Sequence, residues 1–198
     1  VFFVLAIAAG RQQAELFVDA DLIKAKNDLA LIKAKDAEDA KLEKYVLHMM
    51  DISQSSLSPL RKSYLAKDVV RILNIVFDNF EHKQFFVMVM AIESGFNPKA
   101  QSPTGPKGLS QLASAAFKEG VQKCSNLAFD QSDVWHEAIN TLSGACYFKD
   151  LLLNNANGDI RAALVAYNQG PHSIHFKDYK KTGGVQNKEA KGYIKKFN

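Results

Sequence analysis

The segment from Gln12 to Met50 contains neither glycine nor proline, and this feature constrains the fold more than any other. Alanine, leucine, lysine, aspartate and glutamate dominate the segment, and most of these residues favour helices. The segment therefore predicts one long helix or two shorter ones. Leu16, Ile23, Ala30 and Ala37 recur every seven residues, but the partner heptad positions are mostly polar. An amphipathic stalk, which spaces the rest of the chain from a membrane or docks on a partner, explains this pattern better than a coiled coil.

The first residues, Val1 to Ala9, form an uninterrupted apolar run. The run is too short to span a bilayer, which takes about 20 residues. It is similar to the core of a signal peptide, and Ala6-Ile7-Ala8 is similar to a small-x-small cleavage site. Because the chain does not begin with Met, the end of a membrane anchor is a second interpretation, and the start of a buried helix is a third. Both membrane-related interpretations imply export.

A serine-rich segment that ends in proline, Asp51 to Pro59, is typical of a linker. We therefore predict a signal or anchor remnant at 1–10, a helical stalk at 11–50, a linker at 51–60 and a compact domain at 61–198. The chain of 198 residues is 47% hydrophobic, which suffices for one domain with a core of its own and an appendage.

The predicted compact domain contains helical patterns and no convincing strand pair. The segment from Lys83 to Glu93 is almost wholly apolar, and Gly95 and Pro98 follow it as a helix C-cap and a helix stop would. The next segment, Asn97 to Lys107, carries three prolines and a glycine and predicts a loop. Further helices are expected at 63–80, 108–118, 132–154, 158–168 and 187–197. The fold class predicted from these patterns is all-α.

The charge of the chain, +4, suits a polyanionic partner, but no block of Lys and Arg of the nucleic-acid-binding type is present. We therefore expect no nucleic-acid partner. The basic residues near the C-terminus are spread out and indicate a solvated helix face. They are Lys188, Lys191, Lys195 and Lys196.

Two cysteines, Cys124 and Cys146, complete the composition argument. Neither lies in a Cys-x-x-Cys or Cys/His spacing, so we expect no metal site and no cofactor. The two cysteines form one disulfide if the chain works outside the cytoplasm, and otherwise they are buried free thiols. The sequence leaves both alternatives open.

Glu93 is the most informative candidate for catalysis. It lies at the end of the apolar segment and beside the loop of prolines and glycines. A carboxyl group that leaves an apolar environment is partly desolvated and keeps its proton more readily, as a general acid must near neutral pH. Position alone is weak support, because a glutamate at a helix end is usually just solvated.

Three short motifs in fixed order strengthen this hypothesis. They are Glu93-Ser94-Gly95-Phe96-Asn97-Pro98 with Ser102-Pro103-Thr104-Gly105, then Gly108-Leu109-Ser110-Gln111, then Ala166-Tyr167-Asn168-Gln169-Gly170-Pro171. Together they resemble the catalytic core of the soluble lytic transglycosylase family, which belongs to the lysozyme-like superfamily. The resemblance extends over roughly residues 83–197. It implies a lysozyme-like α-helical domain, which the predicted helices support independently.

The resemblance also implies roles for individual residues. Glu93 would protonate the glycosidic oxygen between N-acetylmuramic acid and N-acetylglucosamine and then accept the proton of the C6 hydroxyl, which closes a 1,6-anhydro ring. Five further residues would bind substrate or hold the acid. Ser102 would contact the muramyl N-acetyl group and Gln111 the sugar, Tyr167 would hold Glu93, Asn168 would support the loop or contact substrate, and Tyr193 resembles a tyrosine of the closing helix.

Peptidoglycan is the partner that follows, and the chain is expected to be exported to the periplasm or cell envelope. The predicted stalk suggests tethering to a membrane, or to a machine that crosses the cell wall such as a secretion system or a phage particle.

Two other functions stay open. One is a hydrolase similar to goose-type lysozymes, and the other is a non-catalytic wall-binding component. The second alternative rests on departures from the family pattern, since Ser110 replaces a methionine that lines the cleft and Ala113-Ser114 replaces Met-Pro.

Overall fold

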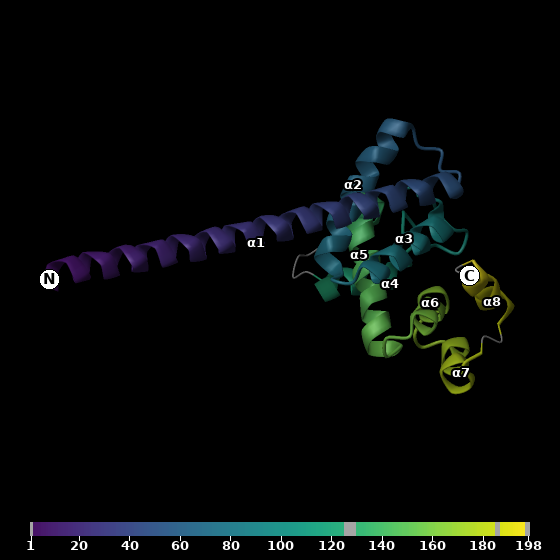
Figure 1. Ribbon diagram of the computed structural model, residues 1–198. Helices are drawn as coiled ribbons and strands as arrows, with labels where there is room; N and C mark the ends of the chain where they lie inside the picture. The colour runs from purple at the N-terminus through teal and green to yellow at the C-terminus, as the bar shows by residue number, and fades with distance from the viewer. Residues whose placement is uncertain (1, 125–129, 185–186, 197–198) are drawn as a thin grey trace. The chain divides into compact units, whose positions relative to one another are not determined.

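The computed structural model describes residues 2–124, 130–184 and 187–196. Within these ranges the chain forms helices and two isolated β-bridges, with no strand (Figure 1). This confirms the predicted all-α fold class. The helical elements are α1 Phe2–Ile52, α2 Pro59–Val76, α3 Phe80–Ser94, α4 Ser114–Cys124, η1 Gln131–Trp135, α5 Glu137–Asp150, η2 Leu151–Asn155, α6 Ile160–Gln169, α7 Ile174–Thr182 and α8 Lys188–Lys195. The chain divides into two compact units, Val1–Lys41 and Leu42–Asn198.

The first unit consists of the N-terminal part of α1, so the long helical segment predicted from the absence of glycine and proline is confirmed as one helix. Its described side chains, from Ile23 to Lys41, are almost all exposed, including the large apolar Leu31 and Ile32. The side chains of the apolar run at 1–10 lie outside the described ones. None of the described helices has both the length and the apolar character that a bilayer crossing requires.

The second unit begins with the last turns of α1. Leu42, Val46 and Met50 recur every four residues, lie on one face of the helix and are fully buried in the core. After α1 ends, Ser58 caps α2 by accepting a hydrogen bond from the backbone N–H of Arg61. The domain boundaries proposed from the sequence, with a linker at 51–60, stay a prediction.

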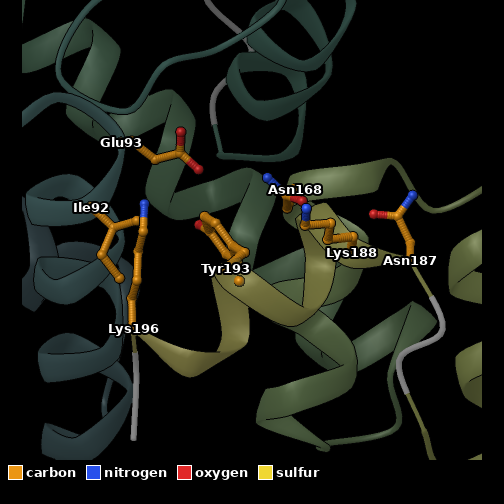
Figure 2. A pocket seen from close by; sticks show the side chains of 8 residues that line it. Ile92, Glu93, Asn168, Asn187, Lys188, Tyr193 and Lys196 are labelled. Atoms are coloured by element: carbon orange, nitrogen blue, oxygen red, sulfur yellow. The ribbon is translucent and has the colours of Figure 1, made fainter.

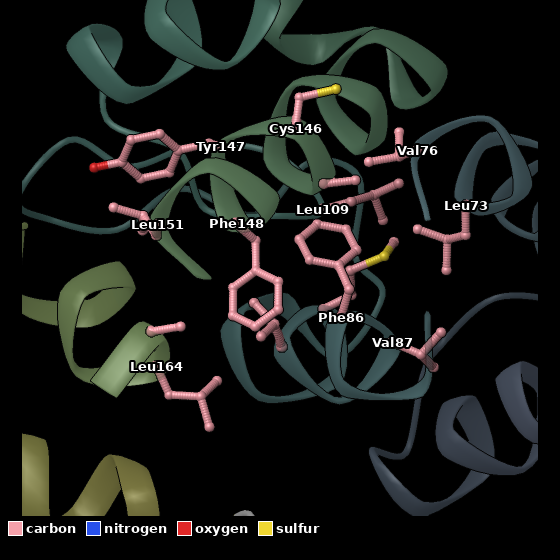
Figure 3. Packing of buried hydrophobic residues seen from close by; sticks show 14 of the residues in the cluster. Leu73, Val76, Phe86, Val87, Leu109, Cys146, Tyr147, Phe148, Leu151 and Leu164 are labelled. Carbon is pink, nitrogen blue, oxygen red and sulfur yellow. The ribbon is translucent and has the colours of Figure 1, made fainter. Parts of the chain in front are cut away.

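Aromatic residues from α3, from α5 and from the C-cap of α2 form the centre of the core, where Figure 3 shows Phe86 beside Phe148. The ring of Phe86 lies 6.0 Å from that of Phe148 and 6.3 Å from that of Phe77, measured between centroids. These separations are typical of stabilising aromatic pairs. Because Phe86 lies in the same helix as Glu93, this packing fixes α3 and with it the position of the candidate acid.

Helices α4 and α5 lie unusually close together. A Cβ atom added to Gly120 would lie 2.1 Å from the backbone oxygen of Ser143, so only glycine permits this approach. The Ser143 hydroxyl donates a hydrogen bond of 2.7 Å to the backbone oxygen of Phe117. Cys124 and Cys146 form a disulfide between the same helices, which settles the alternative that the sequence left open.

Two predicted helices differ from the structure. The helix expected at 108–118 begins only at Ser114, because Gly108 (φ 77°) and Gln111 (φ 45°) have left-handed backbone conformations that a helix does not contain. The helix expected at 132–154 is divided into η1, α5 and η2, with an extended residue at His136. Helix α7 was not predicted.

Candidate active site

Glu93 lies in the last turn of α3 and is half-buried. The helix ends directly after it because Gly95 adopts the left-handed conformation (φ 58°, ψ 32°), as expected for a C-cap glycine. The neighbouring Ser94 hydroxyl makes hydrogen bonds to the backbone oxygens of Leu109, at 2.7 Å, and Met90, at 3.2 Å. The first of these bonds ties the end of α3 to the segment that carries Gln111.

The segment 97–112 forms the loop wall of the site, held in shape mainly by its own backbone. Lys107 and Leu112 exchange two backbone hydrogen bonds of 3.1 and 3.0 Å, and the N–H of Gly108 donates to Ala100 at 2.9 Å. The N–H of Ser102 donates to Pro106 at 2.9 Å. The loop predicted from its prolines and glycine is therefore ordered by backbone hydrogen bonds, which include the isolated β-bridges of Lys107 with Gln101 and with Leu112.

A single buried amide, that of Asn140 in α5, anchors this loop wall. Its Oδ1 accepts the N–H of Ser110 at 2.8 Å, and its Nδ2 donates to the backbone oxygens of Lys107 at 3.1 Å and Val134 at 2.9 Å. Gly108 packs directly on this amide, because a Cβ at that position would lie 2.3 Å from Nδ2. One side chain thus satisfies the buried N–H of Ser110 and the backbone oxygen of Val134, which would otherwise be costly to bury, and makes a second bond to the oxygen of Lys107.

Two predicted substrate-binding residues lie on this wall. Gln111 lines the site, and its Nε2 donates to the backbone oxygens of Ala100 at 3.0 Å and Gly108 at 2.9 Å. The Gln111 side chain therefore stabilises the loop and also lies at the surface of the hollow where we expect it to contact the sugar. The Ser102 hydroxyl lies 2.9 Å from that of Thr104, and both residues face the same hollow.

Ser110 is buried and does not line the cleft. Its side chain packs against Gly144, where an added Cβ would lie 2.5 Å from the hydroxyl oxygen of Ser110. Ser110 therefore contributes nothing to the lining of the cleft, where the resemblance placed a methionine.

Tyr167 and Asn168 come from the end of α6. The Tyr167 hydroxyl donates a hydrogen bond of 2.8 Å to the backbone oxygen of Ser110, which links α6 to the loop wall. Burial, followed by the nearby Glu93 carboxyl, raises the pKa of Tyr167 well above its ordinary value. The Asn168 Oδ1 accepts a hydrogen bond of 2.5 Å from the Gln169 side chain.

Tyr193 in α8 approaches Glu93 from the other side. Burial raises the pKa of its phenol well above the ordinary value, and the charge of Glu93 and a hydrogen bond between the two side chains add to this effect. The phenol therefore stays protonated and can donate to the carboxyl group. The resemblance pointed only to a tyrosine in the closing helix, and the structure adds its contact with the acid.

Glu93 lies between two hollows. The first, of about 600 Å³, lies along the loop wall and is lined by the loop residues just described together with Tyr147, Tyr167 and Asn168. The second, of about 730 Å³, lies between Glu93 and α8 (Figure 2). Glu93 and Asn168 line both hollows. A chain-like ligand that fills both hollows would therefore pass the carboxyl group of Glu93.

Sequence reasoning did not assign several residues to the site. Tyr147 lines the first hollow, and burial raises its pKa to about 12. Lys188 and Lys196 line the second and are exposed, as expected for a solvated helix face. Their spacing of eight residues, with Gly192 halfway, was the available signal. Among the described residues, no group of three or more His, Cys, Asp and Glu could hold a metal ion.

Comparison with known proteins agrees with this arrangement. The sequence pattern of the transglycosylase SLT domain matches residues 79–190, more than half of the chain. The structure resembles the 70 kDa soluble lytic transglycosylase of Escherichia coli with a TM-score of 0.56 and 18% sequence identity. The match covers 80% of this chain and 28% of that protein, and it confirms the lysozyme-like fold expected from the sequence motifs. The chain belongs to the family of transglycosylase SLT domains.

Proposed function

We propose that this chain is a lytic transglycosylase of peptidoglycan. In this reaction Glu93 protonates the oxygen between N-acetylmuramic acid and N-acetylglucosamine, and the bond to the muramyl carbon breaks. The same carboxylate then takes the proton of the muramyl C6 hydroxyl as that oxygen attacks the sugar's own C1. The products are a 1,6-anhydromuramyl end and a free N-acetylglucosamine end, and no water is consumed.

The position of Glu93 between the two hollows carries this proposal. Glycosidases that use water or a covalent intermediate need two carboxyl groups flanking the bond. Among the described residues that line the hollows, Glu93 is the one carboxyl group. An intramolecular nucleophile removes the need for a second carboxylate, since its proximity gives it a high effective concentration.

The surrounding side chains support the double role of Glu93. Tyr193 supplies a hydrogen bond to the carboxyl group, which favours its charged form after proton transfer. Half-burial favours the neutral form beforehand. Ser102 and Gln111 face the first hollow and are the groups we assign to the muramyl side, with Asn168 shared between the two sides.

Analysis of the products by mass spectrometry tests the proposal. Purified peptidoglycan digested with the protein is expected to release muropeptides that end in 1,6-anhydromuramic acid. Reducing muramyl ends would instead establish the hydrolase. A zymogram of the unaltered protein beside Glu93→Gln supplies the control, and if neither protein clears the wall the chain is a non-catalytic wall-binding component.

We further propose that the domain works outside the cytoplasm and is carried by the N-terminal part of α1. The disulfide between Cys124 and Cys146 supports an oxidising compartment. The exposed helix up to Lys41 supports a tether or an attachment to an envelope-crossing assembly. Fractionation of cells expressing the full chain, with and without residues 2–41, tests this: loss of envelope association on deletion is the expected result, and unchanged association contradicts it.

A further inference from the structure

The hollow between Glu93 and α8 carries two positive charges that the proposed chemistry does not use. Lys188 and Lys196 line it together with Asn168, Asn187 and Tyr193. Figure 2 shows both lysine side chains extending from α8 toward the part of the hollow where Glu93 and Asn168 lie, with Tyr193 between them. Both lysines are exposed, so a ligand in the hollow can reach their ammonium groups.

Gly192 separates the two lysines along α8, in which Lys188 is the first residue and Lys196 the C-cap. Lys188, Gly192 and Lys196 follow one another at intervals of four residues and therefore lie on one face of the helix. Gly192 has no left-handed backbone that would require glycine, and a Cβ added to it would meet nothing within 4 Å. Glycine inside a helix lowers the stability of that helix. At Gly192 the missing side chain leaves open space between the aliphatic parts of the two lysine side chains.

The charge of the hollow favours an anion. Glu93 is the one acidic residue among its described lining residues, so the two ammonium groups outnumber the carboxyl groups there. Even with Glu93 ionised, the described lining carries a net positive charge. The two asparagine side chains add hydrogen-bonding groups but no charge.

We propose that Lys188 and Lys196 bind carboxylate groups carried by the muramyl residues of the glycan strand, on the α8 side of the bond that is cleaved. This inference rests on the proposed function. The carboxylates have two sources: the peptide stem attached to muramic acid, and the lactyl group of muramic acid once a stem has been removed. Lys188 and Lys196 would thus select charged strands over neutral ones.

Binding of soluble glycan strands to the Glu93→Gln protein, which holds the strands uncut, provides the test. Three strands are compared: one with peptide stems, one without stems and with free lactyl carboxylates, and one without stems whose lactyl groups are amidated. The double substitution Lys188→Ala/Lys196→Ala is expected to raise Kd roughly 5- to 10-fold for charged strands, the scale of two exposed ion pairs. For the amidated strand, the Kd of the double variant should stay within roughly twofold of the Kd of Glu93→Gln alone, which is below the scale of a single exposed ion pair. Added salt should reduce the difference in Kd for charged strands.

A matched control lies in the same helix. Lys191 and Lys195 are exposed and do not line the hollow. Lys191→Ala/Lys195→Ala therefore removes the same amount of charge from the helix and leaves the lining of the hollow unchanged. This pair should leave Kd nearly unchanged, and Lys188→Arg/Lys196→Arg should restore binding. Gly192→Leu keeps every charge but fills the space between the stems, and it should weaken binding while the helical circular dichroism stays intact.

The pattern across the strands identifies the source of the carboxylate. Weakening only for the stem-bearing strand assigns the stem, weakening only for the free lactyl strand assigns the lactyl group, and weakening for both assigns either. Equal weakening for the amidated strand, equal weakening in the Lys191/Lys195 pair, or no change at all overturns the inference.

The proposed function fails by a different result. If the unaltered protein cleaves peptidoglycan and the Lys188/Lys196 variant binds every strand normally, only this inference is lost. If binding depends on these lysines but the unaltered protein cleaves no strand, the transglycosylase proposal is lost and the charge-selective site remains.

Discussion

The two walls that face Glu93 are built by different physical means. The loop wall, residues 97–112, is held by hydrogen bonds within its own backbone and by the buried Asn140 amide. The α8 wall is a short helix that buries Ala190 and Tyr193 and leaves its lysines exposed. The comparison suggests that the loop wall fixes the geometry of the acid and the sugar beside it. The α8 wall acts on the Glu93 carboxyl group through the phenol of Tyr193 and leaves space for charged substituents of the ligand.

Removal of the acid should have the largest effect, because both walls serve it. Glu93→Gln keeps the size of the side chain but cannot transfer the proton. We expect activity to fall by roughly 10²- to 10⁴-fold, the usual contribution of a general acid, with little change in thermal stability. Activity on isolated peptidoglycan, with melting curves in parallel, measures both. A variant that retains most of its activity would place the acid elsewhere.

The anchor of the loop wall should be the next most sensitive point. Asn140→Ala leaves the N–H of Ser110 and the backbone oxygen of Val134 without their partner, while the oxygen of Lys107 keeps its bond from Leu112. Since each unsatisfied buried group costs about 1–3 kcal/mol, we expect a loss of about 2 kcal/mol or more in the free energy of unfolding. Urea denaturation measures it.

Asn140→Asp is the control, because it keeps the acceptor for Ser110 but loses both donors. The buried carboxylate of Asn140→Asp would face the backbone oxygens of Lys107 and Val134, so stability as low as that of Asn140→Ala, or lower, would support the anchoring role. Equal stability of all three proteins would show that the loop wall does not depend on this amide.

The disulfide should stabilise the support behind the loop wall. It joins α4 to α5 across 22 residues of sequence, and α5 carries Asn140. Closing a loop of this length in the unfolded chain is worth about 3 kcal/mol. Cys124→Ser/Cys146→Ser should therefore lower the free energy of unfolding by about that amount, while a reducing agent should affect only the unaltered protein. Insensitivity of the unaltered protein to reductant would contradict this.

Two tyrosine substitutions sharpen the contrast between the walls. Tyr193→Phe removes the hydroxyl group that bonds to Glu93, so we expect kcat to fall roughly tenfold with KM little changed. Tyr167→Phe removes the hydrogen bond to Ser110 in the loop wall and should affect KM and stability more than kcat. Steady-state kinetics on soluble strands separates the two. Identical effects on kcat and KM would remove the distinction that we draw.

Ionisation of the buried phenols should have the smallest effect on stability near neutral pH and a clear effect in alkali. Folding raises the pKa of Tyr147 from 10.0 to about 12, and it raises the pKa values of Tyr167 and Tyr193 as well. The folded state thus favours the neutral phenols. The contribution of Tyr147 to stability is complete below pH 10 and is lost as the pH rises from 10 through about 12, and the contributions of Tyr167 and Tyr193 are likewise complete below pH 10. Melting temperatures at pH 8, 10 and 11, set by the ordinary tyrosine pKa, should fall steeply only above 10.

Sequence alone determined the features that depend on neighbours in the chain. Helix spacing and the C-cap glycine predicted α3 and its end at Gly95, and the motif order pointed to Glu93, Tyr167 and the lysozyme-like fold. These signals are local because a helix and its cap are formed by residues within one or two turns of each other. The absence of glycine and proline predicted α1 for the same reason.

The tertiary structure decided everything that joins distant parts of the chain. The bond between Ser110 and Asn140 spans 30 residues, and that between Tyr167 and Ser110 spans 57. The left-handed backbone at Gln111 delays the start of the helix that the sequence predicted from residue 108. Packing also brought Lys188 and Lys196 to Glu93 and joined Cys124 to Cys146. Such contacts arise only when buried polar groups find partners and apolar faces come together, and no spacing along the chain encodes which partners those are.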